Sequence, residues 1–289
     1  MLAITTELIN DINSYFENNG LMNLHAEIKE VNKNNQIISG INTYDSIKQA
    51  GVIYYPYEDD DTAGKIARNI IKLIQNMPEV NKDVYFTKEY ILEHVRPCIA
   101  ATYKDNELNP ILKDKTVFPK KCHDISTYYR ICIDNMNYIV TDELLDHVGL
   151  DVFDLELAAT NNLMKIVKFK DMLGMLEELQ AEENINEDLP KDLLYVLTTE
   201  DKYQGAAAML IINNLEMIHK KIKCNFYILP SSVHEVIIVP DTDNQISSKK
   251  TEEFYKMVCD VNRTTVDPID KLTDSVYYYS QENGLEQIA

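Results

Sequence analysis

The sequence predicts an α+β fold with largely antiparallel sheets, helices packed on one face, and a chain that could divide into two subdomains. Two observations favour this class. Runs rich in β-branched and aromatic residues come in pairs separated by short polar turns, which is typical of antiparallel hairpins. Helical patterns occur beside these pairs and do not alternate regularly with single strands, as a parallel sheet would require. With 289 residues, 45% of them hydrophobic, the chain is long enough to bury a substantial core.

The first part of the chain, 1–176, is expected to form an N-terminal α+β region. Residues 4–18 read as an opening helix, and residues 26–44 as a hairpin that turns at Asn32 to Asn35. The strand "GVIYYP" follows. An acidic start at Glu58 to Asp61 then leads into apolar residues at helical spacing, namely Ile66, Ile70, Leu73, Ile74 and Met77. Acidic residues there suit the positive end of a helix dipole.

The middle of the chain predicts a second hairpin. A short helix, "TKEYILEHV", should end before Pro97, and "RPCIAATY" resumes an extended run. The runs "DISTYYRICI" and "NYIVTDELLDHVG" flank the turn-prone pair Asp134-Asn135 and should pair as strands. The stretch "DVFDLELAATNNLMKI" suits a helix with Leu155, Leu157 and Ala158 facing inward.

Residues 177–190, "EELQAEENINEDLP", are the most acidic and least periodic stretch, so we expect an acidic loop or linker there. A C-terminal α+β domain should follow at 191–289. Four strands are expected at "LLYVLTTE", "GAAAMLII", "NFYILP" and "HEVIIVP", with the helix "NLEMIHKKIK" between the second and third. The helix "KKTEEFYKMVCDVNR", with Phe254, Val258 and Val261 as its apolar stripe, precedes a closing strand, "SVYYY".

The chain is strongly acidic, with 28 Lys+Arg against 47 Asp+Glu and a formal charge of -19. Such a charge repels phosphate backbones and anionic lipids, so direct binding of nucleic acid or membrane is disfavoured. A basic protein partner, or an acidic surface that imitates nucleic acid, is compatible with it, although many acidic proteins are simply soluble. No apolar run approaches the roughly 20 residues of a membrane span, and the N-terminus lacks the basic flank of a signal peptide. A cytoplasmic location is therefore expected.

Metal and nucleotide chemistry have little support in the sequence. The five cysteines form no C-x-x-C pair, and the six histidines show no H-E-x-x-H, so we expect neither a disulfide framework nor a metal site. With eight glycines there is no G-x-G-x-x-G or G-x-x-x-x-G-K-[ST] pattern, and no cofactor is predicted.

The candidate catalytic residues are Ser231, Ser232 and His234, in "NFYILPSSVHEVIIVP". Either serine could approach His234 across a tight hairpin and act as a nucleophile. Strand alternation would send His234 and Glu235 to opposite faces, so Glu235 could not orient the imidazole. The competing interpretation is a plain turn, because Pro-Ser-Ser is common turn chemistry and no G-x-S-x-G elbow is present. The triplet Cys122-His123-Asp124 is a further candidate, but catalytic Cys and His normally meet through the fold and not along the chain.

The candidate binding residues are acidic or lie near the C-terminus. They are Glu58, Asp59, Asp60 and Asp61, together with Asn262 and Arg263 of "VNRTTVDP". Asn262 and Arg263 could instead cap the last helix and pair with a carboxylate, which is the favoured interpretation.

Several stretches resemble an uncharacterised domain-of-unknown-function family of gut Clostridia. They are "FYILPSSVHEVIIVP", "MVCDVNRTTVDPIDKLTDSVYYY", "YVLTTEDKYQGAAAML" and "VIYYPYEDDDTAGKIARNIIKLI". The resemblance spans nearly the whole chain, whereas "FPKKCHDIS" departs from the family pattern. It implies a bacterial, cytosolic protein that a phage or mobile element could carry, and it supplies no activity, cofactor or catalytic residue.

Two functional hypotheses follow. The favoured one is a non-enzymatic acidic protein that binds or regulates another protein; a concrete version is charge mimicry against a host defence protein or nucleic-acid-binding protein. The alternative is a hydrolase or transferase with its site near the 230–235 hairpin. The sequence leaves the oligomeric state open.

Overall fold

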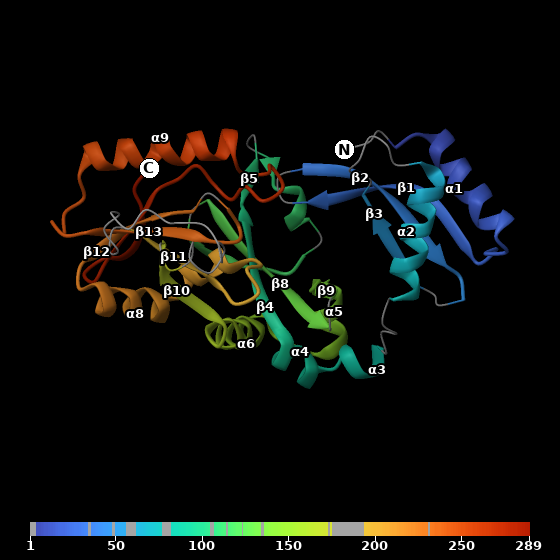
Figure 1. Cartoon of the computed structure of the whole chain (residues 1–289). Helices are drawn as coiled ribbons and strands as arrows, with labels where there is room; N and C mark the ends of the chain where they lie inside the picture. Colours follow the sequence, from blue (N-terminus) through green and yellow to red (C-terminus); the bar gives the residue numbers. More distant parts are fainter. Residues whose placement is uncertain are drawn as a thin grey trace. The chain divides into compact units, whose positions relative to one another are not determined.

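The computed structural model describes residues 4–33, 36–47, 50–55, 62–76, 82–104, 107–113, 115–122, 124–133, 136–172, 174, 194–230 and 232–289. The chain divides into two compact units, 1–81 and 82–289. Figure 1 shows the elements of each. The predicted α+β class with antiparallel sheets is confirmed.

Unit 1 is a three-stranded antiparallel sheet with two helices on one face. Its elements are α1 (Thr6–Asn18), β1 (Leu24–Lys33), β2 (Gln36–Asp45), β3 (Ala50–Tyr54) and α2 (Ala63–Gln75). The side chains of Thr5 and Thr62 accept hydrogen bonds from backbone amides in the first turns of α1 and α2, which fixes where each helix begins. Apolar residues of both helices, such as Phe16 and Ile66, pack on the sheet beside Ile41. The opening helix, the first hairpin and the second helix are thus confirmed.

Unit 2 begins with a smaller antiparallel sheet and the helices around it. The helices are α3 (Lys82–Tyr85), α4 (Lys88–His94), α5 (Asp142–Val148) and α6 (Val152–Met164), with a 3-10 turn, η1, at Pro110–Leu112. The sheet has the order β4-β8-β7 with β9 also paired to β8. Its strands are β4 (Val95–Ala101), β7 (Val117–Cys122), β8 (Ile125–Ile133) and β9 (Met136–Ile139), and a separate ribbon joins β5 (Tyr103–Lys104) to β6 (Glu107–Leu108).

A six-stranded sheet with the order β10-β11-β13-β12-β14-β15 forms the rest of unit 2, and all its neighbouring strands are antiparallel. The strands are β10 (Val167–Asp171), β11 (Tyr195–Thr199), β12 (Asn225–Leu229), β13 (Val236–Asp241), β14 (Tyr277–Ser280) and β15 (Gly284–Gln287). A 3-10 segment, η2 (Gly205–Leu210), and the helices α8 (Ile212–Ile222) and α9 (Ser248–Thr264) complete the unit. The hairpin expected around 230–235 is confirmed by the pairing of β12 with β13.

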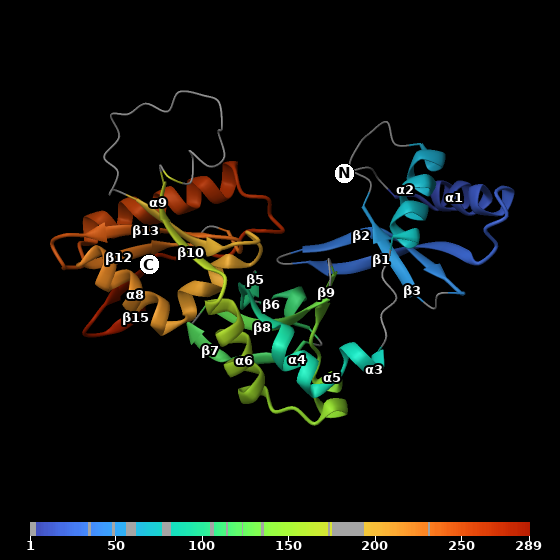
Figure 2. The same cartoon turned by 60° about the horizontal axis from the view of Figure 1, so that its bottom comes forward.

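Helices cover both faces of this sheet, which differs from the one-face arrangement that the sequence predicts. Val258 of α9 packs against Tyr227 and Tyr278 on one face. Residues of η2 and α8, such as Met209 and Leu215, pack with Ile228 on the other. Figures 1 and 2 show α9 and α8 on opposite sides of β12 and β13. The alternating strand residues of "NFYIL" are apolar in both phases, which permits burial on both faces.

Three local predictions are wrong. The stretch "GAAAMLII" is not a strand but the 3-10 segment η2, because the chain turns sharply after β11 and the Ala206 amide bonds to the Val233 carbonyl. The stretch "DELLDHV" is the helix α5, which Thr141 caps at its start and Gly149 ends with a left-handed φ of 65°. Leu157 of α6 is 63% exposed, because the buried face follows Leu155 and the residues four and eight positions on.

The expected acidic loop at 177–190 lies outside the described residues. Strand β10, which precedes it, pairs along its whole length with β11, which follows it. The C-terminal sheet therefore includes a strand from the N-terminal side of that segment. The expected division into 1–176 and 191–289 stays a prediction. The two compact units of the structure divide the chain elsewhere, between residues 81 and 82.

Candidate functional site

The hairpin loop between β12 and β13 positions the sequence-predicted Ser232 and His234. The Ser232 side chain is buried, and its Oγ accepts the backbone amide of His234 at 3.0 Å. Ser232 also forms an isolated β-bridge with Lys271. The hydroxyl thus holds the turn, as the plain-turn interpretation expects. Ser231 lies outside the described residues.

Both ring nitrogens of His234 have partners. Its Nδ1 accepts the backbone amide of Gln204 at 3.3 Å, and its Nε2 lies 3.2 Å from Oδ1 of Asp270. With Nδ1 as an acceptor, the hydrogen of the neutral ring sits on Nε2 and faces the Asp270 carboxylate. His234 precedes β13, whose Val236 and Ile238 share a buried face as the alternation predicts.

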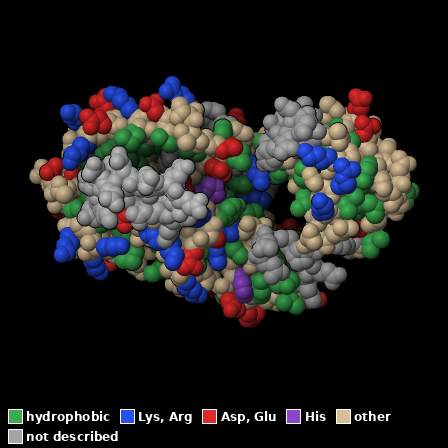
Figure 3. Space-filling model, in the orientation of Figure 1, with side chains coloured by type: hydrophobic (Ala, Val, Ile, Leu, Met, Phe, Trp, Pro, Cys, Tyr) green, Lys and Arg blue, Asp and Glu red, His purple; other side chains and the backbone are tan. Residues whose placement is uncertain are grey.

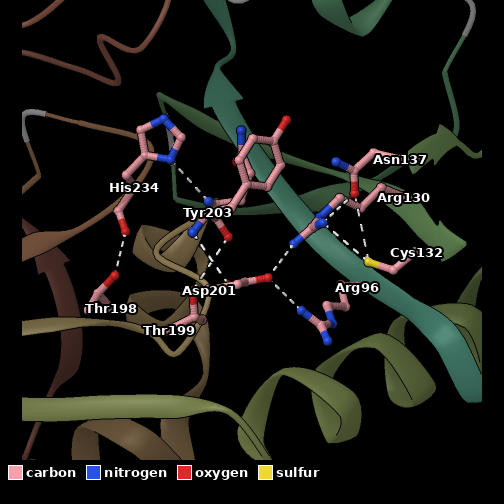
Figure 4. A network of polar contacts seen from close by, with 10 residues as sticks. Arg96, Arg130, Cys132, Asn137, Thr198, Thr199, Asp201, Tyr203 and His234 are labelled. Carbon is pink, nitrogen blue, oxygen red and sulfur yellow. Dashed lines mark hydrogen bonds and ion pairs between the residues drawn. The ribbon is translucent and has the colours of Figure 1, made fainter. Parts of the chain in front are cut away.

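Arg130 forms the centre of a polar network that sequence reasoning did not identify (Figure 4). It lies in the middle of β8, and only 4% of its side chain is exposed. Its Nη1 donates to Sγ of Cys132 at 3.2 Å and to Oδ1 of Asn137, and its Nη2 lies 3.4 Å from Oδ2 of Asp201. A guanidinium remains protonated when buried, so it needs such acceptors around it.

Asp201 joins two arginines. Arg96, which lies opposite Arg130 in the β4–β8 pair, donates to Oδ2 of Asp201 at 2.7 Å. Oδ1 of the same carboxylate accepts the Thr199 hydroxyl at 2.7 Å. Burial alone would raise the pKa of Asp201, but these hydrogen bonds and the charges of both arginines outweigh it, so the pKa lies below its ordinary value.

Tyr203 connects the Arg130 network to His234. The guanidinium of Arg130 lies 4.6 Å from the centroid of the Tyr203 ring, and the His234 ring centroid lies 5.5 Å away from that of Tyr203. Figure 4 shows the tyrosine between the two. Burial raises the pKa of Tyr203 above its ordinary value, so its hydroxyl stays neutral near pH 7. We call Arg96, Arg130, Asp201, Tyr203 and His234, with their hydrogen-bond partners, the Arg130 network.

The loop 201–205 has an unusual backbone that creates this arrangement. Lys202 and Gln204 adopt positive φ values of 52° and 57°, which L residues seldom do. Gly205 has no space for a side chain, because a Cβ there would lie 2.5 Å from the His234 carbonyl oxygen and 2.7 Å from the Thr199 amide. The side chain of buried Gln204 accepts the Ile99 amide at 2.9 Å and ties the loop to β4. The loop is therefore locked between two sheets.

The other sequence-predicted binding residues do not join this network. Asn262 is buried in α9 and donates to the Thr273 carbonyl and to Oδ1 of Asp274, each in the segment before β14. Arg263 is exposed and pairs with Asp260 one turn earlier at 2.9 Å. Both residues therefore contact other parts of the fold, in line with the structural role that the sequence analysis favours for them. Glu58, Asp59, Asp60 and Asp61 lie outside the described residues.

The triplet at 122–124 is described only in part. His123 lies outside the described residues, and only the backbone of Cys122, the last residue of β7, is described. Asp124 accepts hydroxyl hydrogen bonds from Thr273, Ser275 and Tyr277, and so ties the start of β8 to the C-terminal strand region. These three hydrogen bonds give the Asp124 carboxylate a structural role.

No group of three or more metal-ligating side chains occurs within the described part of the chain. Cys98 of β4, the strand that pairs with β8, is 1% exposed, and burial raises its pKa to about 12. A thiol in that state is a poor nucleophile and a poor metal ligand.

In the described ranges, no helix is both long and apolar enough to cross a bilayer.

The arrangement is better suited to holding two sheets together than to catalysis. A general base needs a free ring nitrogen facing the nucleophile, whereas both nitrogens of His234 have other partners and the Ser232 hydroxyl bonds to backbone. Burial raises the pKa of the adjacent Glu235, and its hydrogen bond with Ser232 opposes that shift only in part. A hydrolase or transferase site at 230–235 stays a prediction, which these contacts weaken.

The fold and the network thus define an α+β protein whose best-formed polar cluster pairs its carboxylate with two arginines inside the fold, although the buried Nε of Arg130 has no hydrogen-bond partner among the described residues. The chain belongs to DUF5688, a family of unknown function, whose model matches residues 4–281. This confirms the resemblance to an uncharacterised domain family. Comparison with curated proteins and with solved structures gives no match.

Proposed function

We propose that the protein is a non-enzymatic binding or regulatory protein of the bacterial cytoplasm, whose acidic surface engages a basic protein partner. The observation that carries the proposal is the formal charge of -19. A field of that sign accelerates the encounter with basic proteins and opposes the approach of phosphate backbones. The contacts that engage His234 and Ser232 within the fold support a binding role over catalysis.

Some surface charges are paired within the fold and others are not. On α9, exposed ion pairs form within the helix, at Lys249–Glu253, Lys256–Glu252 and Arg263–Asp260. Figure 3 shows acidic and basic side chains interspersed along this helix, at the upper left. Because α9 is locally neutralised, the excess of carboxylates must act from other surfaces. A phage-borne or mobile-element protein could use them to imitate nucleic acid against a host defence protein or nucleic-acid-binding protein.

The test is affinity capture of the tagged protein from lysate of its natural host, at low and at moderate salt, followed by mass spectrometry. We expect a stoichiometric basic partner whose yield falls as salt rises, because screening weakens surface electrostatics. An acidic protein of matched size and charge serves as the control for nonspecific capture. Capture of nothing beyond that control, at either salt concentration, would overturn the proposal.

A further inference from the structure

A groove in unit 2 combines an apolar floor with an acidic rim. It has a volume of about 950 Å³, and its lining comes from α3, from residues 86–87 at the start of α4, from β9 and from α5 with its N-cap. The ends of α4, α5 and β9 lie close together in both Figure 1 and Figure 2. The volume is at the upper end of the range for ligand sites, and the groove is open to solvent.

The floor is built from aromatic and aliphatic side chains. Phe86 and Tyr138 meet edge to face with ring centroids 4.8 Å apart, and Ile139 and Leu144 extend this apolar surface. Tyr138 is 38% exposed although it lies on a strand of the sheet. Aromatic rings held in this way supply contact area at low entropic cost, which is typical of protein-binding surfaces.

The rim is acidic. Asp83, Glu143 and Asp146 contribute carboxylates, and the lining residues that the structure describes include no lysine or arginine. Glu143 and Asp146 lie three positions apart on α5, so their side chains share a face of the helix. Neither forms an ion pair with a described residue. This contrasts with α9, where the exposed carboxylates have lysine or arginine partners.

We infer that this groove, the α4–α5 groove, binds a basic amphipathic helix of a partner protein. Apolar side chains at helical spacing would lie on Phe86, Tyr138 and Leu144, while lysines or arginines beside them would meet Glu143 and Asp146. Charge complementarity selects this occupant, because an acidic rim repels phosphate, lipid headgroups and acidic peptides. The inference rests on the proposed function and names the surface and the kind of partner.

The direct test uses a fluorescein-labelled synthetic helix with leucines at positions i, i+3, i+4 and i+7 and lysines elsewhere. Two matched peptides, one scrambled to lose the periodicity and one with glutamate for lysine, serve as probes of specificity. Fluorescence anisotropy should show that the wild type binds the first peptide at least about tenfold more tightly than either control. No binding of the first peptide, or equal binding of the scrambled one, would overturn the groove proposal.

Two variants locate the site on the protein. Glu143→Gln/Asp146→Asn should weaken binding about tenfold, since it removes two exposed ion pairs with the peptide. Tyr138→Ala should weaken it by a similar or larger factor. The matched control, Asp11→Asn/Glu17→Gln, removes two exposed carboxylates from α1 in unit 1 and should leave affinity within about twofold. Equal losses in both double variants would show a general charge effect and overturn the inference.

A measurement without mutations guards against misfolded variants. Hydrogen exchange of the wild type should show new protection at 83–87 and 138–147 when the peptide is added, and protection confined to other segments would contradict the groove. A dimer that forms without peptide and protects the same segments would overturn the inference in favour of a second copy of the chain.

Repeating the lysate capture with the groove variants separates the two proposals. A partner captured by the wild type and lost with Glu143→Gln/Asp146→Asn supports both. A partner captured equally by wild type and variant contradicts the groove and leaves the binding function intact. Capture of nothing by the wild type contradicts the binding function itself.

Discussion

The Arg130 network and the α4–α5 groove both place charges beside aromatic rings, but they differ in how those charges are matched. In the network, Asp201 faces two arginines and a threonine hydroxyl, and Arg130 is almost fully buried. In the groove, Glu143 and Asp146 face solvent without an ion-pair partner among the described residues. Buried charge must be compensated within the fold, whereas exposed charge remains available to another molecule. The more elaborate cluster therefore stabilises the fold, and the simpler surface is the one that we propose as a binding site.

The largest expected effect comes from Gly205→Ala, which inserts a methyl group where the backbone leaves no space. The new Cβ would meet the His234 carbonyl oxygen and the Thr198 hydroxyl at 2.5 Å, so the locked loop must move. We expect a loss of about 3 kcal/mol in the free energy of unfolding, measured by urea denaturation. The control is Gly64→Ala in α2, where the nearest atom is 3.5 Å away and the change should be neutral or stabilising by up to about 1 kcal/mol. Equal behaviour of the two variants would show that the loop is not locked.

The next effect is that of Asp201→Asn, which leaves Arg130 buried with no carboxylate. Removing one partner of a buried pair costs about 3 to 5 kcal/mol. Because the Asp201 side chain is 38% exposed, we expect a smaller loss of about 2 to 3 kcal/mol by urea denaturation. The neighbouring Glu200→Gln is the control, since it removes only a surface pair with Lys168 and should cost at most about 1 kcal/mol. A loss for Asp201→Asn no larger than that of the control would mean that Arg130 does not depend on this carboxylate.

The pH dependence of stability should reveal the contribution of the same Asp201 carboxylate. The folded state holds the pKa of Asp201 below the unfolded value of about 3.9, so the stabilisation is complete above that pH and is lost as pH falls through the folded pKa. Between about pH 6 and about pH 3, the wild type should therefore lose more stability than Asp201→Asn. Burial gives Glu235 a shift of opposite sign, but both proteins contain it, so the difference isolates Asp201. Parallel pH profiles of melting temperature would contradict this assignment.

Local sequence patterns predict much of the fold, because capping residues and apolar periodicity act over a few positions. The opening helix, the three hairpins and α9 follow from such patterns. Helix α5 is missed because the strand run "NYIV" leads directly into it, so its capping residues Thr141 and Gly149 lie in a stretch that begins as a strand. Segment η2 is missed because its conformation depends on contacts with the distant residue Val233.

The candidate site is harder to predict for the same reason. His234 and Ser232 are visible as a motif, but their partners Gln204, Asp270 and Lys271 come from other segments. Arg130 carries one local signal, a single charge in the apolar run "ISTYYRICI", which indicates a buried cation that needs an acceptor. That acceptor, Asp201, is 71 residues away and no local pattern connects the two. The quoted stretch "YVLTTEDKYQGAAAML" contains the locked loop, although its role is visible only in three dimensions.

The smallest stability effect is expected for Glu143→Gln/Asp146→Asn. This variant tests directly whether the groove carboxylates stabilise the fold or serve a partner. Glu143 lies in the first turn of α5, where its charge stabilises the helix by about 0.3 to 1 kcal/mol. Removing the repulsion between the two carboxylates returns a few tenths of a kcal/mol. The net change in unfolding free energy should therefore stay within about 0.5 kcal/mol, measured in parallel with Asp201→Asn. A loss above about 1 kcal/mol would assign these carboxylates to the fold, whereas near-neutral stability with weakened peptide binding would show that they serve a partner.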